Sequence, residues 1–259
     1  MKIKESIAKG FKVSKNSMNV VLVLFVFGAI WNVINVALTP QLATAQNAPA
    51  PVASAGVIGA GLVFMLLSVF IQGGSLGFIR DLVKTGKAEF SSFTASGGKY
   101  YLKLFLLGLL VAAIVGVLIL LAAVAVAVLA KAANVVGIIL ALLLASLGIY
   151  FALLILLAPY AIVVDGSGVM ASVKHSIKLV KQNILTVLAI VGLLILIGFG
   201  IGIVMGALFA LIRLGIPGTA SDYVFGILGS FVNAYLGVVV TGSFMNLYLS
   251  VSNNNTSGA

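Results

Sequence analysis

The stretch APYAIVVDGSGVMASVKHSIKLVKQN, residues 158–183, contains the sharpest change of polarity in the chain. An apolar run passes through Pro159 and Tyr160 and ends at Asp165, and a second apolar run begins at Ile184. A short polar segment between two long apolar runs is typical of the point where a polytopic membrane protein leaves the bilayer and returns to it. The topology of the whole chain can be worked out from this point.

The polar segment itself has the periodicity of an amphipathic helix. Its aliphatic and basic residues each recur every three to four positions, which places them on opposite faces of a helix. The apolar face comprises Val169, Val173, Ile177, Val180 and Ile184, and the basic face comprises Lys174, Lys178 and Lys181. We expect Asp165 or Ser167 to be the N-cap, and we expect the helix to lie in the headgroup plane with His175 facing the headgroups.

The composition defines the class of protein. Of the 259 residues, 62% are hydrophobic and only 8% are charged, whereas soluble domains are nearer half apolar and a quarter charged. Long unbroken apolar runs favour membrane helices over the short alternating strands of a β-barrel. The absence of cysteine excludes disulfides and thiolate chemistry. In such a chain, a net charge of +10 indicates anionic lipid headgroups as partners, and we expect no nucleic acid.

The predicted architecture is all-α, a single six-helix membrane domain over residues 1–259. Six spans are expected at approximately 18–38, 56–79, 104–130, 134–164, 184–212 and 223–251, in three hairpins, with a flexible loop at 39–55 and a disordered tail at 252–259. The fourth span is longer than the ~30 Å hydrocarbon core requires, so we expect it to tilt, to kink at Pro159 or to project from the bilayer.

Each hairpin is preceded by a basic segment. Residues 1–17 form an amphipathic helix that places Lys9 and Lys12 opposite its apolar face, and the segment from Phe90 to Leu102 is a less regular interfacial element. The alternative for residues 1–17 is the charged start of a signal peptide, with a small-x-small cleavage pattern at 43–45. We prefer an interfacial helix followed by a first span.

The basic residues predict the orientation. With the N-terminus inside, the segments before span 1, between spans 2 and 3 and between spans 4 and 5 are all internal and hold 13 of the 15 lysines and arginines; only Lys131 and Arg213 lie outside. This distribution follows the positive-inside rule. We therefore expect an inner or plasma membrane protein with both termini in the cytoplasm.

A short internal repeat links the first and third of these basic segments. Residues 6–15, SIAKGFKVSK, align with residues 172–181, SVKHSIKLVK, with serine and two lysines matching and apolar residues matching at three further positions. The two units share one orientation, unlike the inverted repeats typical of alternating-access carriers.

Small residues spaced four apart predict where helices pack. Gly198, Gly202 and Gly206 form one such stripe in the fifth span, and the sixth span has another, at Gly226, Ser230 and Ala234. In lipid, close packing by small residues holds helices together. The alternative, in which these glycines line a pore or act as hinges, is less favoured.

Polar side chains inside the spans are few: Asn32, Asn35, Gln72 and Asn233, with Asn246 near the inner end of the sixth span. Buried amides usually bond across helices, although Asn32, Asn35 and Asn233 fall in the outer half of the spans and could together bind a polar solute. All five carboxylates lie at or beyond span ends, so the intramembrane acids of a proton-coupled carrier are lacking. We also expect no cofactor, no metal site and no catalytic set around the lone His175.

The segment Pro159-Tyr160, Asp165-Gly166 and residues 171–181 resembles a signature of an uncharacterised family of prokaryotic six-helix integral membrane proteins, related to the membrane domain of glycerophosphodiester phosphodiesterases. The resemblance implies a membrane module without catalytic residues, because those relatives carry their chemistry in a separate soluble domain. We therefore expect a non-enzymatic, membrane-organising module that contacts lipid headgroups or a protein partner through a basic cytoplasmic face. The alternative is a facilitator or channel-like permease for a small neutral or amphiphilic solute.

Overall fold

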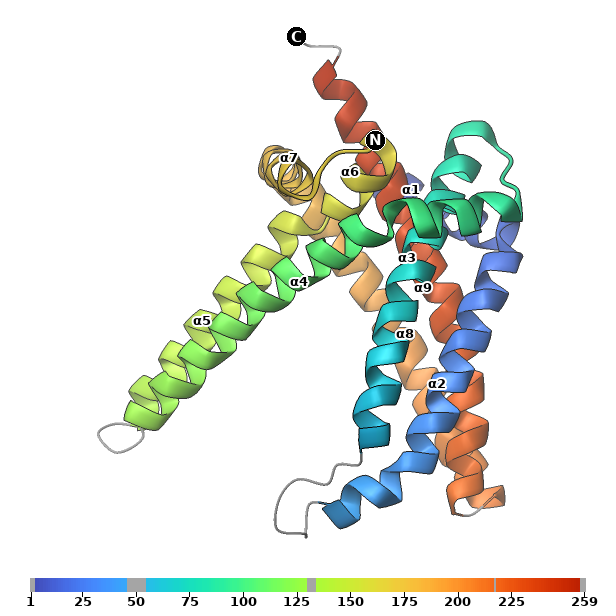
Figure 1. Cartoon of the computed structure of the whole chain (residues 1–259), viewed down its shortest axis with the longest axis vertical. Coiled ribbons are helices and arrows are strands. Elements are labelled where there is room, and N and C mark those ends of the chain that lie inside the picture. The colour runs from blue at the N-terminus through green and yellow to red at the C-terminus, as the bar shows by residue number, and fades with distance from the viewer. Residues whose placement is uncertain (1–2, 46–54, 130–133, 217, 257–259) are drawn as a thin grey trace. The chain divides into compact units, whose positions relative to one another are not determined.

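The computed structural model describes residues 3–45, 55–129, 134–216 and 218–256, and every regular element in these ranges is an α-helix. The helices, labelled in Figure 1, are α1 (Ile3–Asn16), α2 (Met18–Ala45), α3 (Ala55–Thr85), α4 (Phe90–Leu129), α5 (Asn134–Ile155), α6 (Ala158–Asp165), α7 (Val169–Gln182), α8 (Ile184–Gly215) and α9 (Thr219–Thr256).

Six segments of the described chain are long and apolar enough to cross a bilayer. They are Met18–Ala37, Ile58–Thr85, Phe90–Val124, Ile139–Asp165, Ile184–Gly215 and Thr219–Ser252. Large apolar side chains are exposed along all of them, for example Leu196 and Phe199 on α8. Such surfaces are stable in hydrocarbon and not in water, so the chain is an all-α polytopic membrane protein.

Contacts group the chain into two compact units, which are described separately. Unit 1 comprises residues Met1–Lys99 and Leu185–Ala259, and unit 2 comprises Tyr100–Ile184. In unit 1, α2 and α3 pack beside α9, and α1 packs against α9 (Figure 1). In unit 2, α7 packs on both α5 and α6, and the α4–α5 hairpin leads into them.

Small residues allow the helices of unit 1 to approach closely. A Cβ atom added at Gly10 of α1 would overlap the Ser243 hydroxyl of α9, and one added at Gly242 would lie 3.1 Å from the Val13 side chain. The start of α4 meets α3 in the same way: a Cβ at Gly97 would lie 2.9 Å from the Phe70 ring. These glycines therefore set the distances between helix axes.

Three predicted boundaries are wrong. Residues 39–45 continue α2 instead of forming a loop, and residues 252–256 continue α9 instead of a disordered tail, while 46–54 and 257–259 lie outside the described residues. Proline is unfavourable in a helix interior, but Pro40 lies near the C-terminus of α2, and the alanine and leucine residues after it favour helix. The third difference is that the interfacial element at Phe90 and the third span form one continuous helix, α4.

The long fourth span is interrupted before its proline. Helix α5 ends at Ile155 and α6 begins at Ala158, so that Pro159 lies in the first turn of α6. A proline is tolerated there because the first N–H groups of a helix have no intrahelical acceptor. The break consists of Leu156 and Leu157, whose apolar side chains give no sign of it in the sequence.

Candidate lipid-contacting surface

Helix α7 begins after a glycine turn. Gly166 has φ +68° and closes the C-terminus of α6 in the left-handed region, which glycine adopts without steric cost. Gly168 occupies the N-cap position of α7, and no side chain caps the helix. The prediction that Asp165 or Ser167 is the N-cap is therefore wrong, because Asp165 is the last residue of α6.

Lys103 of α4 stabilises this turn. Its Nζ donates a hydrogen bond to the carbonyl oxygen of Gly166 at 2.5 Å. A cation at the C-terminal carbonyls of a helix also complements the helix dipole. One of the basic residues assigned to the inner face from the sequence thus has a structural partner within the protein.

The buried face of α7 carries two serines that the hydrophobic periodicity did not predict. The buried residues are Ser172, Val173, Ser176, Leu179 and Val180. The face predicted from the sequence is therefore rotated: Val169 and Ile177 are only half-buried, and Leu179 and the serines take the central positions.

Ser176 holds α7 against the break between α5 and α6. Its hydroxyl donates to the carbonyl oxygen of Leu154 at 2.7 Å and accepts from the N–H of Leu157 at 3.1 Å. Both backbone groups lose their intrahelical partners at the break, and an unpaired backbone group costs several kcal/mol in hydrocarbon. The spacing of Ser172 and Ser176 by one turn was the sequence signal for this face.

The lysines of α7 point away from this contact. Lys174, Lys178 and Lys181 are exposed, and no carboxylate in the described part of the chain lies within ion-pair distance of them. Three uncompensated positive charges therefore lie on the side of α7 opposite its packing contacts. His175, between the two faces, is half-buried.

Helix α1 repeats this design position by position. Its buried residues are Ser6, Ile7, Gly10, Val13 and Ser14. When residues 6–15 are aligned with 172–181, each of these residues is aligned with a buried residue of α7. Gly10, which contacts α9, is aligned with Ser176, which contacts the break between α5 and α6. The exposed lysines at 12 and 15 likewise match those at 178 and 181. The repeat therefore shares a packing face as well as a few identical residues.

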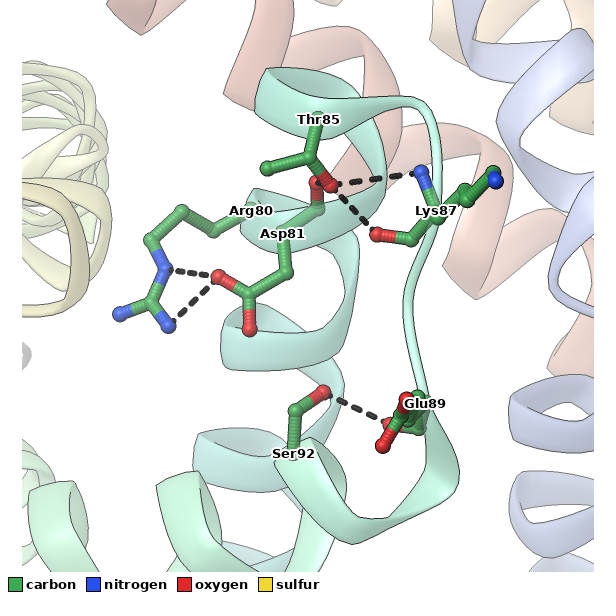
Figure 2. Close-up of polar contacts among 6 residues, drawn as sticks. All are labelled: Arg80, Asp81, Thr85, Lys87, Glu89 and Ser92. Carbon is green, nitrogen blue, oxygen red and sulfur yellow. Dashed lines mark hydrogen bonds and ion pairs between the residues drawn. The ribbon is translucent and has the colours of Figure 1, made fainter.

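The turn from α3 to α4 is held by polar contacts of its own (Figure 2). Arg80 Nε donates to Asp81 Oδ1 at 2.7 Å, which offsets one positive charge in this segment. Thr85 Oγ1 lies 2.8 Å from the Asp81 carbonyl oxygen and 2.6 Å from that of Lys87, and its single proton can serve one of them at a time. Lys84 and Lys87 remain exposed beside this turn.

Hydrogen bonds among the described residues place Asn32 and Asn35 in different surroundings. Asn32 Nδ2 donates to Ser230 Oγ of α9 at 2.7 Å and to the Gly28 carbonyl oxygen at 3.1 Å. Asn35 bonds the Trp31 carbonyl oxygen, whereas Gln72 and Asn233 are exposed. Asn32 thus has the interhelical role expected of a buried amide.

The two small-residue stripes differ. Gly226 and Ser230 face α2: a Cβ at Gly226 would lie 3.3 Å from Asn32 Cβ, and one at Gly28 3.5 Å from Ser230 Cβ. At Gly198, Gly202 and Gly206 on α8, an added Cβ would meet no atom of the described residues within 4 Å. The described residues of unit 1 therefore show close packing at the α9 stripe, and the packing role of the α8 stripe stays a prediction.

Ionisable groups in the described residues do not assemble into a metal site, since no three or more of the histidine and acidic residues gather there. The fold defines a helical, polytopic membrane protein, and α1 and α7 each bury one set of residues and expose lysines.

A family model described as "Domain of unknown function (DUF7847)" matches residues 1–252, and the chain belongs to that family. No curated protein and no solved structure matches the chain. Nothing in these comparisons links it to the membrane domains of glycerophosphodiester phosphodiesterases, so that part of the resemblance stays a prediction.

Proposed function

We propose that the chain is a non-enzymatic integral membrane protein of the inner or plasma membrane, with both termini in the cytoplasm, that binds anionic lipid headgroups through a basic cytoplasmic face. The observation that carries the proposal is the geometry of α7. One face is fixed by Ser176 and buried aliphatic side chains, and the other presents three exposed lysines that form no ion pair with the described part of the chain.

The exposed positive charges of α7 favour an anionic leaflet. A lysine close to an anionic leaflet gains on the order of 1 kcal/mol. A lysine that already pairs with a carboxylate would gain less. Lys174, Lys178 and Lys181 have no such pair with any of the described residues. A flat helix with three such lysines therefore favours anionic over neutral lipid in its immediate surroundings.

The α4–α5 hairpin of unit 2 offers a surface that suits acyl chains. A groove of about 350 Å³ between the two helices is lined by aliphatic and small residues, among them Leu118, Ala145 and Gly148. Alanine and glycine keep the groove open, and no ionisable side chain lines it. A groove of this kind supports lipid contact along the hairpin as well as at its basic end.

A facilitator for a polar solute has less support. Both amide protons of Asn32 are used by Gly28 and Ser230, so this side chain has no donor left for a solute. Proteoliposomes in which Asn32→Leu or Asn233→Leu abolishes the flux of a small neutral solute would favour the facilitator over the lipid-binding proposal.

The proposal is tested by lipid enrichment. The full chain is extracted from vesicles of phosphatidylethanolamine and phosphatidylglycerol, and the retained lipids are counted by native mass spectrometry. The wild type should be enriched in phosphatidylglycerol. Replacing Lys174, Lys178 and Lys181 together by Gln should remove most of the enrichment, and replacing them by Arg should keep it, because the charge is retained. Equal enrichment in the Gln variant would overturn the proposal.

A further inference from the structure

A second basic feature lies in unit 1, where α1, α3 and α9 enclose a pocket of about 380 Å³. Lys9, Lys12 and Asn16 of α1 line one side, and Asn246 of α9 and Gly86 after α3 line the others. Aliphatic residues, including Leu82 and Val83, complete the wall. We propose that this pocket binds a single phosphate group, as the headgroup of a glycerophospholipid or as a soluble phosphate ester.

The pocket is preorganised by close helix packing. Gly10, next to Lys9, lies against Ser243, and Gly242 lies against Val13. Asn246 follows Gly242 by one turn, and its Nδ2 donates to the Gly242 carbonyl oxygen at 2.8 Å, which fixes the amide. Because these contacts hold α1 on α9, the polar groups of the two helices converge without any rearrangement on binding.

The charge of the pocket suits one phosphate group. Lys9 is 3.0 Å from Glu5, which offsets one of the two lysine charges, while Lys12 has no carboxylate within reach in the described residues. The C-terminal end of α3 adds a small negative potential, which the bond from Gly86 N to the Leu82 carbonyl oxygen partly satisfies. Among the lining residues, the net positive charge is therefore near one, which suits a single phosphate.

The wall of the pocket suits a glycerophosphate more than a bare ion. Leu82, Val83 and Val13 provide apolar surface beside the lysines and amides. Polar groups that fix orientation within an otherwise apolar wall are typical of small-molecule sites, and the volume lies at the low end for such sites. Ammonium groups and amide N–H groups form charge-assisted hydrogen bonds with phosphate oxygens.

The same helix provides the matched control. Lys15 is exposed on α1 but does not line the pocket, so a general attraction to anions should affect it as it affects Lys12. Only a site at the pocket would make the two lysines differ. Both are exposed, so replacing either by Gln should leave the fold intact.

This inference rests on the proposed function and adds a defined ligand at one place on the basic face. In the test, the full chain in neutral detergent is titrated at constant ionic strength with inorganic phosphate, glycerol 3-phosphate and short-chain phosphatidylglycerol, and binding is followed by thermal stabilisation. We expect saturable binding that Lys12→Gln weakens by about tenfold or more, with Asn246→Leu weakening it as well and Lys15→Gln leaving it unchanged.

The titrations with glycerol 3-phosphate and with phosphatidylglycerol distinguish a soluble phosphate ester from a lipid headgroup. Equal binding of glycerol 3-phosphate and phosphatidylglycerol indicates a soluble ester as ligand, and binding of phosphatidylglycerol alone indicates a lipid headgroup. Titrations that do not saturate, or equal effects of Lys12→Gln and Lys15→Gln, overturn the inference. If the Gln variant of α7 also loses lipid enrichment in that case, the proposed function stands without the pocket.

Discussion

Gly10→Ala tests the packing that positions α1. The added Cβ would overlap the Ser243 hydroxyl and lie 2.6 Å from the Val239 carbonyl oxygen. The hydroxyl can rotate away only by giving up its 2.7 Å hydrogen bond to that same carbonyl oxygen. The carbonyl belongs to the backbone of α9, so the contact is relieved only if the whole of α1 moves.

The expected cost follows from three terms. Overpacking of this kind costs about 1–3 kcal/mol, and losing the Ser243 hydrogen bond costs about 0.5–1.5 kcal/mol. Alanine returns about 1 kcal/mol through its better helix propensity. The variant should therefore be less stable by about 1–3 kcal/mol, with a fall of about 2–4 °C in Tm per kcal/mol for a chain of roughly this size.

The assay combines a thermal melt in detergent with hydrogen exchange, because α1 could detach without global unfolding. Exchange should rise along residues 3–16 in Gly10→Ala. The matched control is Gly98→Ala on α4, where an added Cβ meets no atom within 4 Å. A Gly10→Ala protein as stable and as protected as Gly98→Ala would refute the reasoning.

Two further pairs of variants test the helix contacts. Ser176→Ala removes the hydroxyl that bonds both the Leu154 carbonyl oxygen and the Leu157 N–H, and it should cost about 1–3 kcal/mol in unfolding free energy. Ser172→Ala should be neutral or stabilising, because the buried Ser172 hydroxyl has no hydrogen-bond partner among the described residues. Equal losses in the two melts would contradict this assignment. Gly97→Ala should lower the Tm and Gly98→Ala should not, because only the first would meet the Phe70 ring and backbone.

The helix pattern was predictable from the sequence because it depends on solvent. A hydrocarbon environment requires long apolar helices, and a headgroup environment requires amphipathic ones, so the periodicity around Lys174, Lys178 and Lys181 located α7 correctly. The periodicity of residues 1–17 likewise located α1. Where both sides of a helix are apolar, as in α8, the periodicity does not indicate which face packs against another helix.

The features that sequence reasoning missed depend on partners that are distant in the chain. Leu156 and Leu157 give no sign of a helix break, which is compensated by Ser176 some twenty residues later. Gly198 and Gly226 belong to equally regular stripes, yet among the described residues only the second faces another helix closely. A small residue permits a close approach, but what it approaches is decided by the fold.

The pocket of unit 1 is also formed by residues that are distant in the chain. Lys9 and Lys12 were singled out as headgroup contacts from their place on an amphipathic helix, whereas Asn246 was only a polar residue near a helix end. The glycines at 10 and 242 bring these groups together. Their role emerges only when both helices are seen, because the sequence does not show which residues of the other helix each glycine approaches.

The central claim is that the lysine-bearing helices share the cytoplasmic side of the membrane, and cysteine labelling tests it most directly. The chain contains no cysteine, so single variants can be labelled without background. In vesicles of known sidedness, a membrane-impermeant maleimide should reach Lys15→Cys, Lys87→Cys and Lys178→Cys only from the cytoplasmic side, and Thr219→Cys only from the opposite side. Labelling of Lys15→Cys and Lys178→Cys from opposite sides would contradict the account.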